Sequence, residues 1–195
     1  MKHLKTLAVI GLILLGAIPI IATTLVGTED NGASSGSITA LTCSEFAAAA
    51  SGTATSIWAR SGDDFGSANW TMAIYASGGT LPTGAPIASS TAVTAVSAAN
   101  TLYQSNGLTC AVACAITAST DYWVCVWSDS ANVEGSWAAG TTNQTAYDDS
   151  GETHPNWPTW NGVLNLDRQY DIYVDGTVAG GGAPAGSMGL MGVGR

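Results

Sequence analysis

The sequence has few charged side chains and almost no basic ones. Charged residues make up only 10% of the 195 residues, and no lysine follows Lys5. Beyond the first 24 residues, three arginines stand against 14 acidic residues, which gives a net charge of −11. Such a chain would be repelled by a phosphate backbone, so the composition argues against nucleic acid as a partner.

Helical patterns and common catalytic motifs are also missing. No amphipathic helical stretch of useful length follows the apolar start of the chain, and small residues are abundant, so we expect a β-protein with many tight turns. There is no Gly-Xaa-Ser-Xaa-Gly motif, and no acidic cluster has the spacing of an EF-hand loop. The only histidines are His3 and His154, which argues against a zinc site. We therefore expect a protein without enzymatic activity.

The first 24 residues have the three parts of a secretory signal peptide. Lys2 and Lys5 give a positive start, an uninterrupted apolar run covers residues 7–22, and Ala22 is a suitable last residue before cleavage. As a helix, the same leader is long enough to be an uncleaved membrane anchor instead, because no charge lies between Lys5 and Glu29. Both interpretations predict a secreted or cell-surface protein, attached to a membrane only through this segment.

Two glycine-rich stretches flank the rest of the chain. Residues 25–36 are interpreted as a linker, and residues 179–195 as a flexible tail. The tail carries a short apolar patch from Met188 to Val193, through which copies of the protein could self-assemble. The alternative is a disordered terminus.

The strongest strand signal is the segment 121–130, DYWVCVWSDS. It is rich in β-branched and aromatic residues, and both of its faces are apolar, so it predicts a central strand covered on both sides. Eight or nine short strand candidates lie between residues 37 and 178, at a spacing typical of a β-sandwich or barrel. We expect one all-β domain over residues 37–178, built as a two-sheet β-sandwich.

Several of these segments resemble a family of jelly-roll modules, often called carbohydrate-binding-module-like, found in secreted bacterial proteins and in phage virion and tail proteins. The resemblance implies a jelly-roll sandwich with a surface-binding or structural role, and it carries over no catalytic residue. Cys110 and Cys114 belong to an insertion that the family pattern lacks. The matching segments are Ser51–Arg60, Trp70–Ser77, Gly84–Ser90 and Ile116–Ser130.

The chain has four cysteines, which outside the cytoplasm indicate two disulfide bonds. Three pairings are possible, and we favour Cys43–Cys125 with Cys110–Cys114. In one straight strand Cys110 and Cys114 would lie about 13 Å apart, too far to bond, whereas a loop at residues 111–113 would bring them together. The other bond would join the first strand candidate of the domain to the central strand.

Seven tryptophans are many for this length, and most of those in strand candidates are expected in the core. Trp137, Trp157 and Trp160 instead lie at or in polar loops. Their indoles could stack on a sugar ring, while Asn156 and Asp149 bind the hydroxyl groups. The alternative, which we weigh equally, is that these three tryptophans cap an open end of the sandwich.

Acidic pairs in the loops offer oxygen ligands for a structural Ca²⁺, which would be the only cofactor. The candidates are Asp63, Asp64 and Asp148. The alternative is that these acids belong to ordinary solvated turns.

These observations predict a non-enzymatic extracellular or virion-associated binding or adhesion module, with a glycan or another surface polymer as the ligand class to test first. One alternative is a structural subunit of a surface layer, filament or phage tail, whose partner is protein. A second alternative is a glycoside-acting enzyme, which needs two carboxylates about 5–10 Å apart in a groove.

Overall fold

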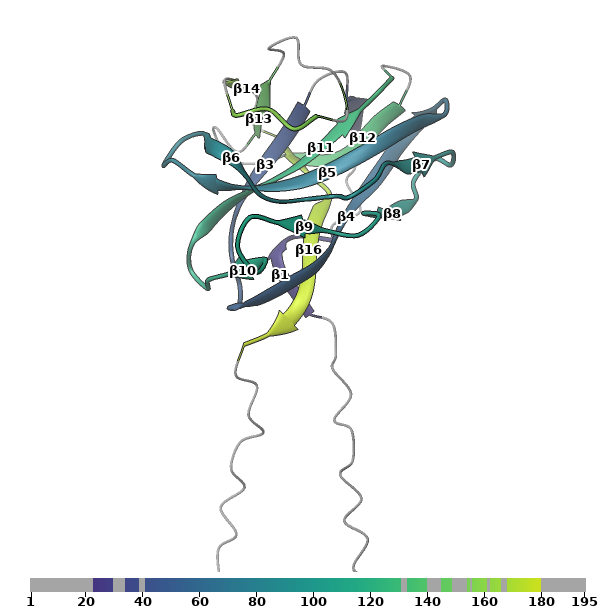
Figure 1. The fold of residues 1–195 in the computed structure, drawn as a ribbon. Coiled ribbons are helices and arrows are strands. Elements are labelled where there is room, and N and C mark those ends of the chain that lie inside the picture. Colours follow the sequence, from purple (N-terminus) through teal and green to yellow (C-terminus); the bar gives the residue numbers. More distant parts are fainter. Residues whose placement is uncertain are drawn as a thin grey trace, which may run out of the picture.

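The structure is a computed structural model in which all regular elements of the described part are antiparallel β-strands (Figure 1). No helix able to span a membrane occurs in that part of the chain. Residues 1–22 of the predicted leader and residues 180–195 of the predicted tail lie outside it. The described residues are 23–29, 34–38, 41–130, 133–139, 145–148, 154, 156–160, 162–165 and 168–179.

Eight of the strands form the first sheet. Three of them pair beside the main path: β2 (Ser34–Ser37) with β12, and β8 (Leu102–Gln104) and β10 (Ala115–Ile116) with β4. The main path runs through β1 (Thr23–Gly27), β16 (Ile172–Val178), β4 (Gly52–Phe65), β12 (Val133–Ala139) and β15 (Arg168–Tyr170).

The other eight strands form the second sheet. A short strand, β7 (Thr94–Val96), pairs with β5 beside the main path. That path runs through β14 (Val163–Asn165), β13 (Thr145–Asp148), β3 (Leu41–Ala47), β11 (Asp121–Ser128), β5 (Ala68–Ser77), β6 (Pro82–Ser89) and β9 (Thr109–Cys110).

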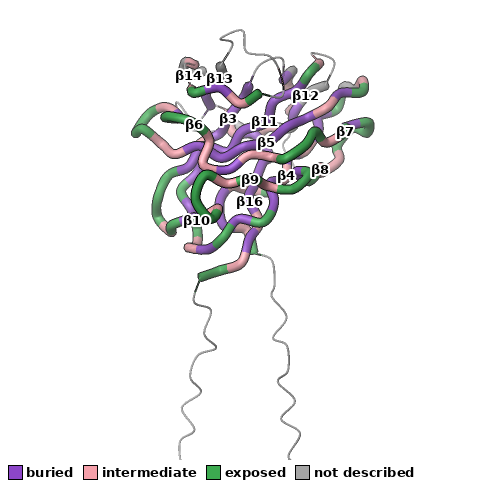
Figure 2. Tube along the Cα trace, in the orientation of Figure 1, coloured by how far each residue is buried: buried purple, intermediate pink, exposed green. Residues whose placement is uncertain are grey.

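The main core is built from both sheets, which gives the fold its sandwich-like form. Trp70, Met72 and Ile74 alternate along β5 and are almost fully buried, as the period of two in a strand requires. Ile57 of β4 and Ile172 of β16 join the same cluster. Figure 2 shows the buried stretches of β5, β11 and β16 in purple. The prediction of an all-β domain is confirmed.

The strand predicted to be central is β11, and it lies between β3 and β5. All residues from Tyr122 to Ser128 are buried. Its second face contributes Trp123 and Cys125 to a smaller core on the outer side of the second sheet, together with Tyr75. The prediction of a strand covered on both sides is confirmed because a second apolar layer lies outside this sheet.

Strands β1 and β2 both lie partly in the range interpreted as a linker, residues 25–36. The strands therefore begin before the expected boundary at residue 37, and β1 includes two residues that were assigned to the leader. Leu25 is fully buried because it fills a slot between two glycines. A methyl group on Gly176 would lie 2.5 Å from Leu25 Cδ1, and one on Gly52 would lie 3.0 Å from Cδ2.

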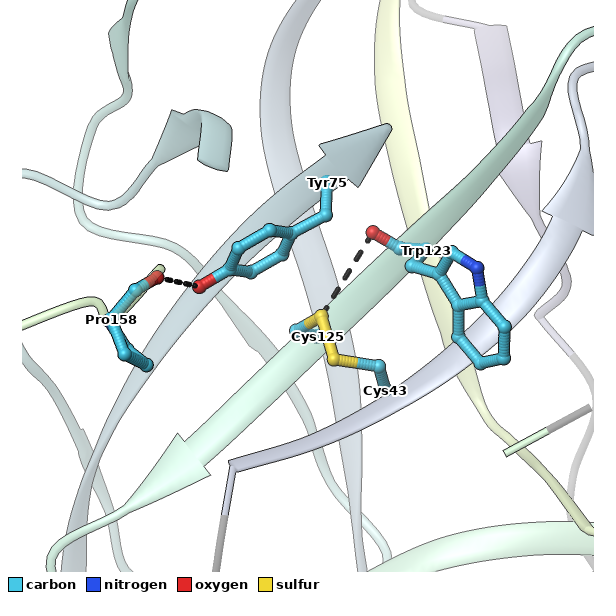
Figure 3. The surroundings of a disulfide bond; sticks show 5 residues. All are labelled: Cys43, Tyr75, Trp123, Cys125 and Pro158. Carbon is cyan, nitrogen blue, oxygen red and sulfur yellow. Dashed lines mark hydrogen bonds between the residues drawn. A yellow bond between two sulfur atoms is a disulfide. The ribbon is translucent and has the colours of Figure 1, made fainter. Parts of the chain in front are cut away.

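Both favoured disulfide pairings are confirmed. Cys43 and Cys125 are directly opposite each other on β3 and β11, with 4.0 Å between their Cα atoms (Figure 3). Cys110 and Cys114 have Cα atoms 5.1 Å apart. They meet because the chain between them loops out, and Ala113 and Cys114 adopt left-handed backbone angles with φ of 47° and 49°.

Candidate functional site

An aromatic layer covers the outer face of the second sheet. Tyr75 of β5 contacts both Trp157 and Trp160 edge-on, with ring centroids 6.3 and 6.0 Å apart. Trp127 of β11 contacts Trp157 in the same way at 5.9 Å. The Tyr75 hydroxyl donates a 3.0 Å hydrogen bond to the carbonyl of Pro158 (Figure 3). Segment 156–160 is therefore fixed on the sheet by rings from two strands.

His154 attaches the same region to the sheet. Its Nε2 lies 3.2 Å from the hydroxyl of Thr71, and its ring packs edge-on against Trp127 at 5.3 Å. Burial lowers the pKa of His154, and the negative charge of Asp129 opposes this effect in part. The hydroxyl–imidazole pair resembles a nucleophile with its base, but Thr71 is only 2% exposed, so a substrate does not reach it. The pair positions the chain on the sheet.

Segment 156–160 has a surface of mixed chemistry. Asn156 and Thr159 are exposed, Trp157 and Trp160 are half-buried, and Pro158 is buried. Both indole nitrogens are buried without a hydrogen-bond partner, so the surface that the tryptophans still expose does not include the N–H group. The segment combines apolar ring surface with an amide and a hydroxyl group.

The remaining predicted binding residues do not join this segment. Trp137 lies on β12 in the first sheet and packs against the main core, with the guanidinium of Arg168 4.3 Å from its ring centroid. Asp149 lies outside the described residues. Of the predicted set, the structure brings together Trp157, Trp160 and Asn156.

Two of the three Ca²⁺ candidates are neighbours on β4, and the third lies on β13 in the other sheet. Asp63 is exposed and accepts a 2.7 Å hydrogen bond from the side-chain amide of Asn100. Asp64 lies on β4 and Asp148 on β13, but neither side chain is among those described. Among the described residues, no group of three His, Cys, Asp or Glu side chains is placed to hold a metal ion.

The structure also contains an apolar groove that the sequence did not predict. It has a volume of about 350 Å³ and runs between the end of β5, the start of β11 and the loop closed by Cys110–Cys114. The β5–β6 ladder is interrupted between the pairs Ile74–Ala88 and Ala76–Thr83, and Ile87 from the unpaired stretch lines the groove. Val112, on the lip of the groove, is 79% exposed. The one sequence feature that could have pointed to this groove is the inserted loop between Cys110 and Cys114.

A second groove, of about 390 Å³, has a lining of mixed chemistry and is more polar than the first. It lies where β5, β7 and the end of β11 meet, and the carboxylate of Asp129 lines it. Burial raises the pKa of Asp129, but hydrogen bonds from the backbone and side-chain N–H groups of Asn69, at 2.8 and 2.7 Å, together with the nearby His154, hold the pKa below its usual value. Asp129 is therefore ionised near neutral pH and is poorly suited to donate a proton.

Comparison with known proteins does not place this chain in a family. No protein-family model, no curated protein and no solved structure matches the chain.

Both arginines of the described residues take part in contacts within the protein. Arg60 Nε lies 2.6 Å from Oδ2 of Asp171, a carboxylate whose side chain is only 1% exposed. The guanidinium of Arg168 lies over the ring of Trp137. The described surface therefore has little positive charge to offer an anionic ligand.

Proposed function

We propose that this protein is an exported, non-enzymatic β-sandwich of jelly-roll type that binds a neutral glycan through segment 156–160. The observation that carries the proposal is the placement of Trp157 and Trp160 on Tyr75 and Trp127. A platform that is already rigid loses little conformational entropy when a ligand binds. The same contacts explain how the two tryptophans cover the sheet, so capping and binding are compatible roles.

The chemistry of the segment fits an uncharged sugar. The apolar face of a sugar ring can lie on partly exposed indole carbon, while the Asn156 amide and the Thr159 hydroxyl exchange hydrogen bonds with its hydroxyl groups. The acidic composition disfavours polymers that carry carboxylates, sulfates or phosphates. The two disulfide bonds fit an oxidising compartment, where extracellular glycans are found.

The proposal is tested by removing polar groups that do not hold the fold. Asn156→Ala combined with Thr159→Ala should weaken binding of the best neutral glycan from an array by about 10- to 30-fold, because two hydrogen bonds contribute about 1 kcal/mol each. Asn106→Ala with Thr109→Ala changes an exposed Asn and Thr elsewhere and is the matched control. Titration calorimetry gives the affinities, and circular dichroism checks the fold.

Two results would contradict the proposal. One is that the wild-type protein binds no neutral glycan on the array, and the other is that both double variants bind as the wild type does. Light scattering on the same samples addresses the alternative of a structural subunit, which would self-associate and show no glycan affinity.

A further inference from the structure

The apolar groove beside the Cys110–Cys114 loop is open to solvent although its walls are hydrophobic. Ala76, Ile87, Ala115 and Tyr122 line it, and Val112 is the most exposed of the large hydrophobic residues described. A volume of about 350 Å³ lies in the range of ligand pockets. Apolar surface of this kind is stabilised when another apolar segment covers it.

The chain leaves the sandwich next to this groove. Gly52 of β4 pairs with Ile116 of β10 on one side and with Val178 of β16 on the other. Val178 therefore lies two strand spacings, about 10 Å, from Ile116, which follows the groove residue Ala115. One residue further, the Ala179 N–H donates a 2.8 Å hydrogen bond to the carbonyl of Ser51.

The residues that follow have the composition to fill the groove. Residues 180–187 are a Gly-, Ala-, Pro- and Ser-containing spacer, and segment 188–193 contains two methionines, a leucine and a valine. Methionine adapts its shape to irregular apolar gaps. Arg195 then carries the charge opposite to that of Asp121, an exposed residue that lines the groove.

We propose that segment 188–193 docks into the apolar groove of its own chain. This inference is independent of the glycan site, which lies on segment 156–160. The eight-residue spacer reaches about 26 Å when extended, at roughly 3.3 Å per residue. As a Gly-rich coil its root-mean-square length is about 16 Å, which is more than the separation of about 10 Å between Val178 and Ile116.

The short spacer favours the same chain over a neighbouring copy. A flexible spacer of this length gives an effective concentration in the millimolar range. A second copy at micromolar concentration competes poorly with that, so even a segment of modest affinity occupies its own groove. The occupied groove would hide Val112 together with the two methionines of the tail.

Methionine oxidation tests the proposal on the full chain. Peroxide should convert Met188 and Met191 to sulfoxides several-fold more slowly than in a synthetic peptide of residues 183–195, because docking shields the sulfur atoms. Mass spectrometry of proteolytic fragments gives each rate, and Met72, at 1% exposure, is the internal reference for a fully shielded methionine.

Val112→Asp should raise the oxidation rates of both tail methionines to those of the peptide, since it places a charge on the lip of the groove. Its side chain is exposed, so the fold should tolerate the change. Val93→Asp is the matched control: Val93 is another exposed valine, between β6 and β7, and its replacement should leave the shielding intact.

Three results would overturn the proposal. The first is oxidation of Met188 and Met191 in the intact chain at the rate of the free peptide. The second is shielding that increases over a hundredfold range of protein concentration, which would place the segment on a second copy. The third is shielding that Val112→Asp and Val93→Asp leave equally unchanged.

Discussion

Removing the Cys43–Cys125 bond should destabilise the protein by about 2.5 kcal/mol more than removing the Cys110–Cys114 bond. The residues of the first bond are 82 apart in sequence, for which the chain-entropy relation gives about 4.5 kcal/mol. Those of the second are four apart, which gives about 2 kcal/mol. Cys43 and Cys125 are also fully buried, so the loss of their sulfur contacts adds to the difference.

The comparison uses two variants, Cys43→Ala with Cys125→Ala and Cys110→Ala with Cys114→Ala. Urea unfolding without reductant gives each free energy of unfolding by linear extrapolation. The free energies have to be compared rather than the midpoints, because removal of a cross-link expands the unfolded state and raises the denaturant dependence. An equal loss of stability in both variants, or a larger loss in the Cys110→Ala and Cys114→Ala variant, would refute the reasoning from loop length and burial.

Two further perturbations test the packing. Burial lowers the pKa of His154, so the unfolded state binds a proton at a higher pH than the folded state, and the free energy of unfolding should fall as pH drops below about 6.5. His154→Gln should reduce this slope in urea unfolding at a series of pH values, and an unchanged slope would contradict it. Gly176→Ala should cost about 1–3 kcal/mol, because its methyl group would collide with the backbone carbonyl oxygen of Thr53 and lie 2.5 Å from Leu25 Cδ1. Faster amide exchange in β1 should accompany that loss, and exchange at the wild-type rate would show that the slot tolerates the methyl group.

The central strand was predictable because its information is local. Six consecutive residues, Tyr122–Trp127, carry apolar side chains on both faces, and only a strand covered on two sides satisfies that pattern. The pairing of Cys43 with Cys125 was favoured because it would join the first strand candidate to the central strand. Cys110–Cys114 followed because a loop was the only way to join two cysteines so close in sequence.

Strand β1 was not predictable, because its residues continue the apolar run of the leader without a visible boundary. What makes Thr23–Gly27 a strand is the slot for Leu25, and its two glycines come from β4 and β16, 27 and 151 residues further along the chain. A single sequence contains no local signal for a contact of that kind.

The aromatic layer was half predictable. The polar context of Trp157 and Trp160 marked them as unusual, but their support by Tyr75 depends on residues more than 80 positions away. Trp137 has a similar sequence context and still belongs to the other sheet. Both grooves depend on where separate strands end, so neither left a pattern in the sequence beyond the inserted cysteine loop.

The pairing of β1 with β16 places Thr23 opposite Gly176, so the chain enters and leaves the sandwich at one end. A mechanical force applied at these two points would peel β1 away from β16, breaking the hydrogen bonds of their ladder one after another instead of all together. The outer strands would thus yield at low load. Extension would then halt at the covalent loop between residues 43 and 125, which keeps the centre of the second sheet intact under tension.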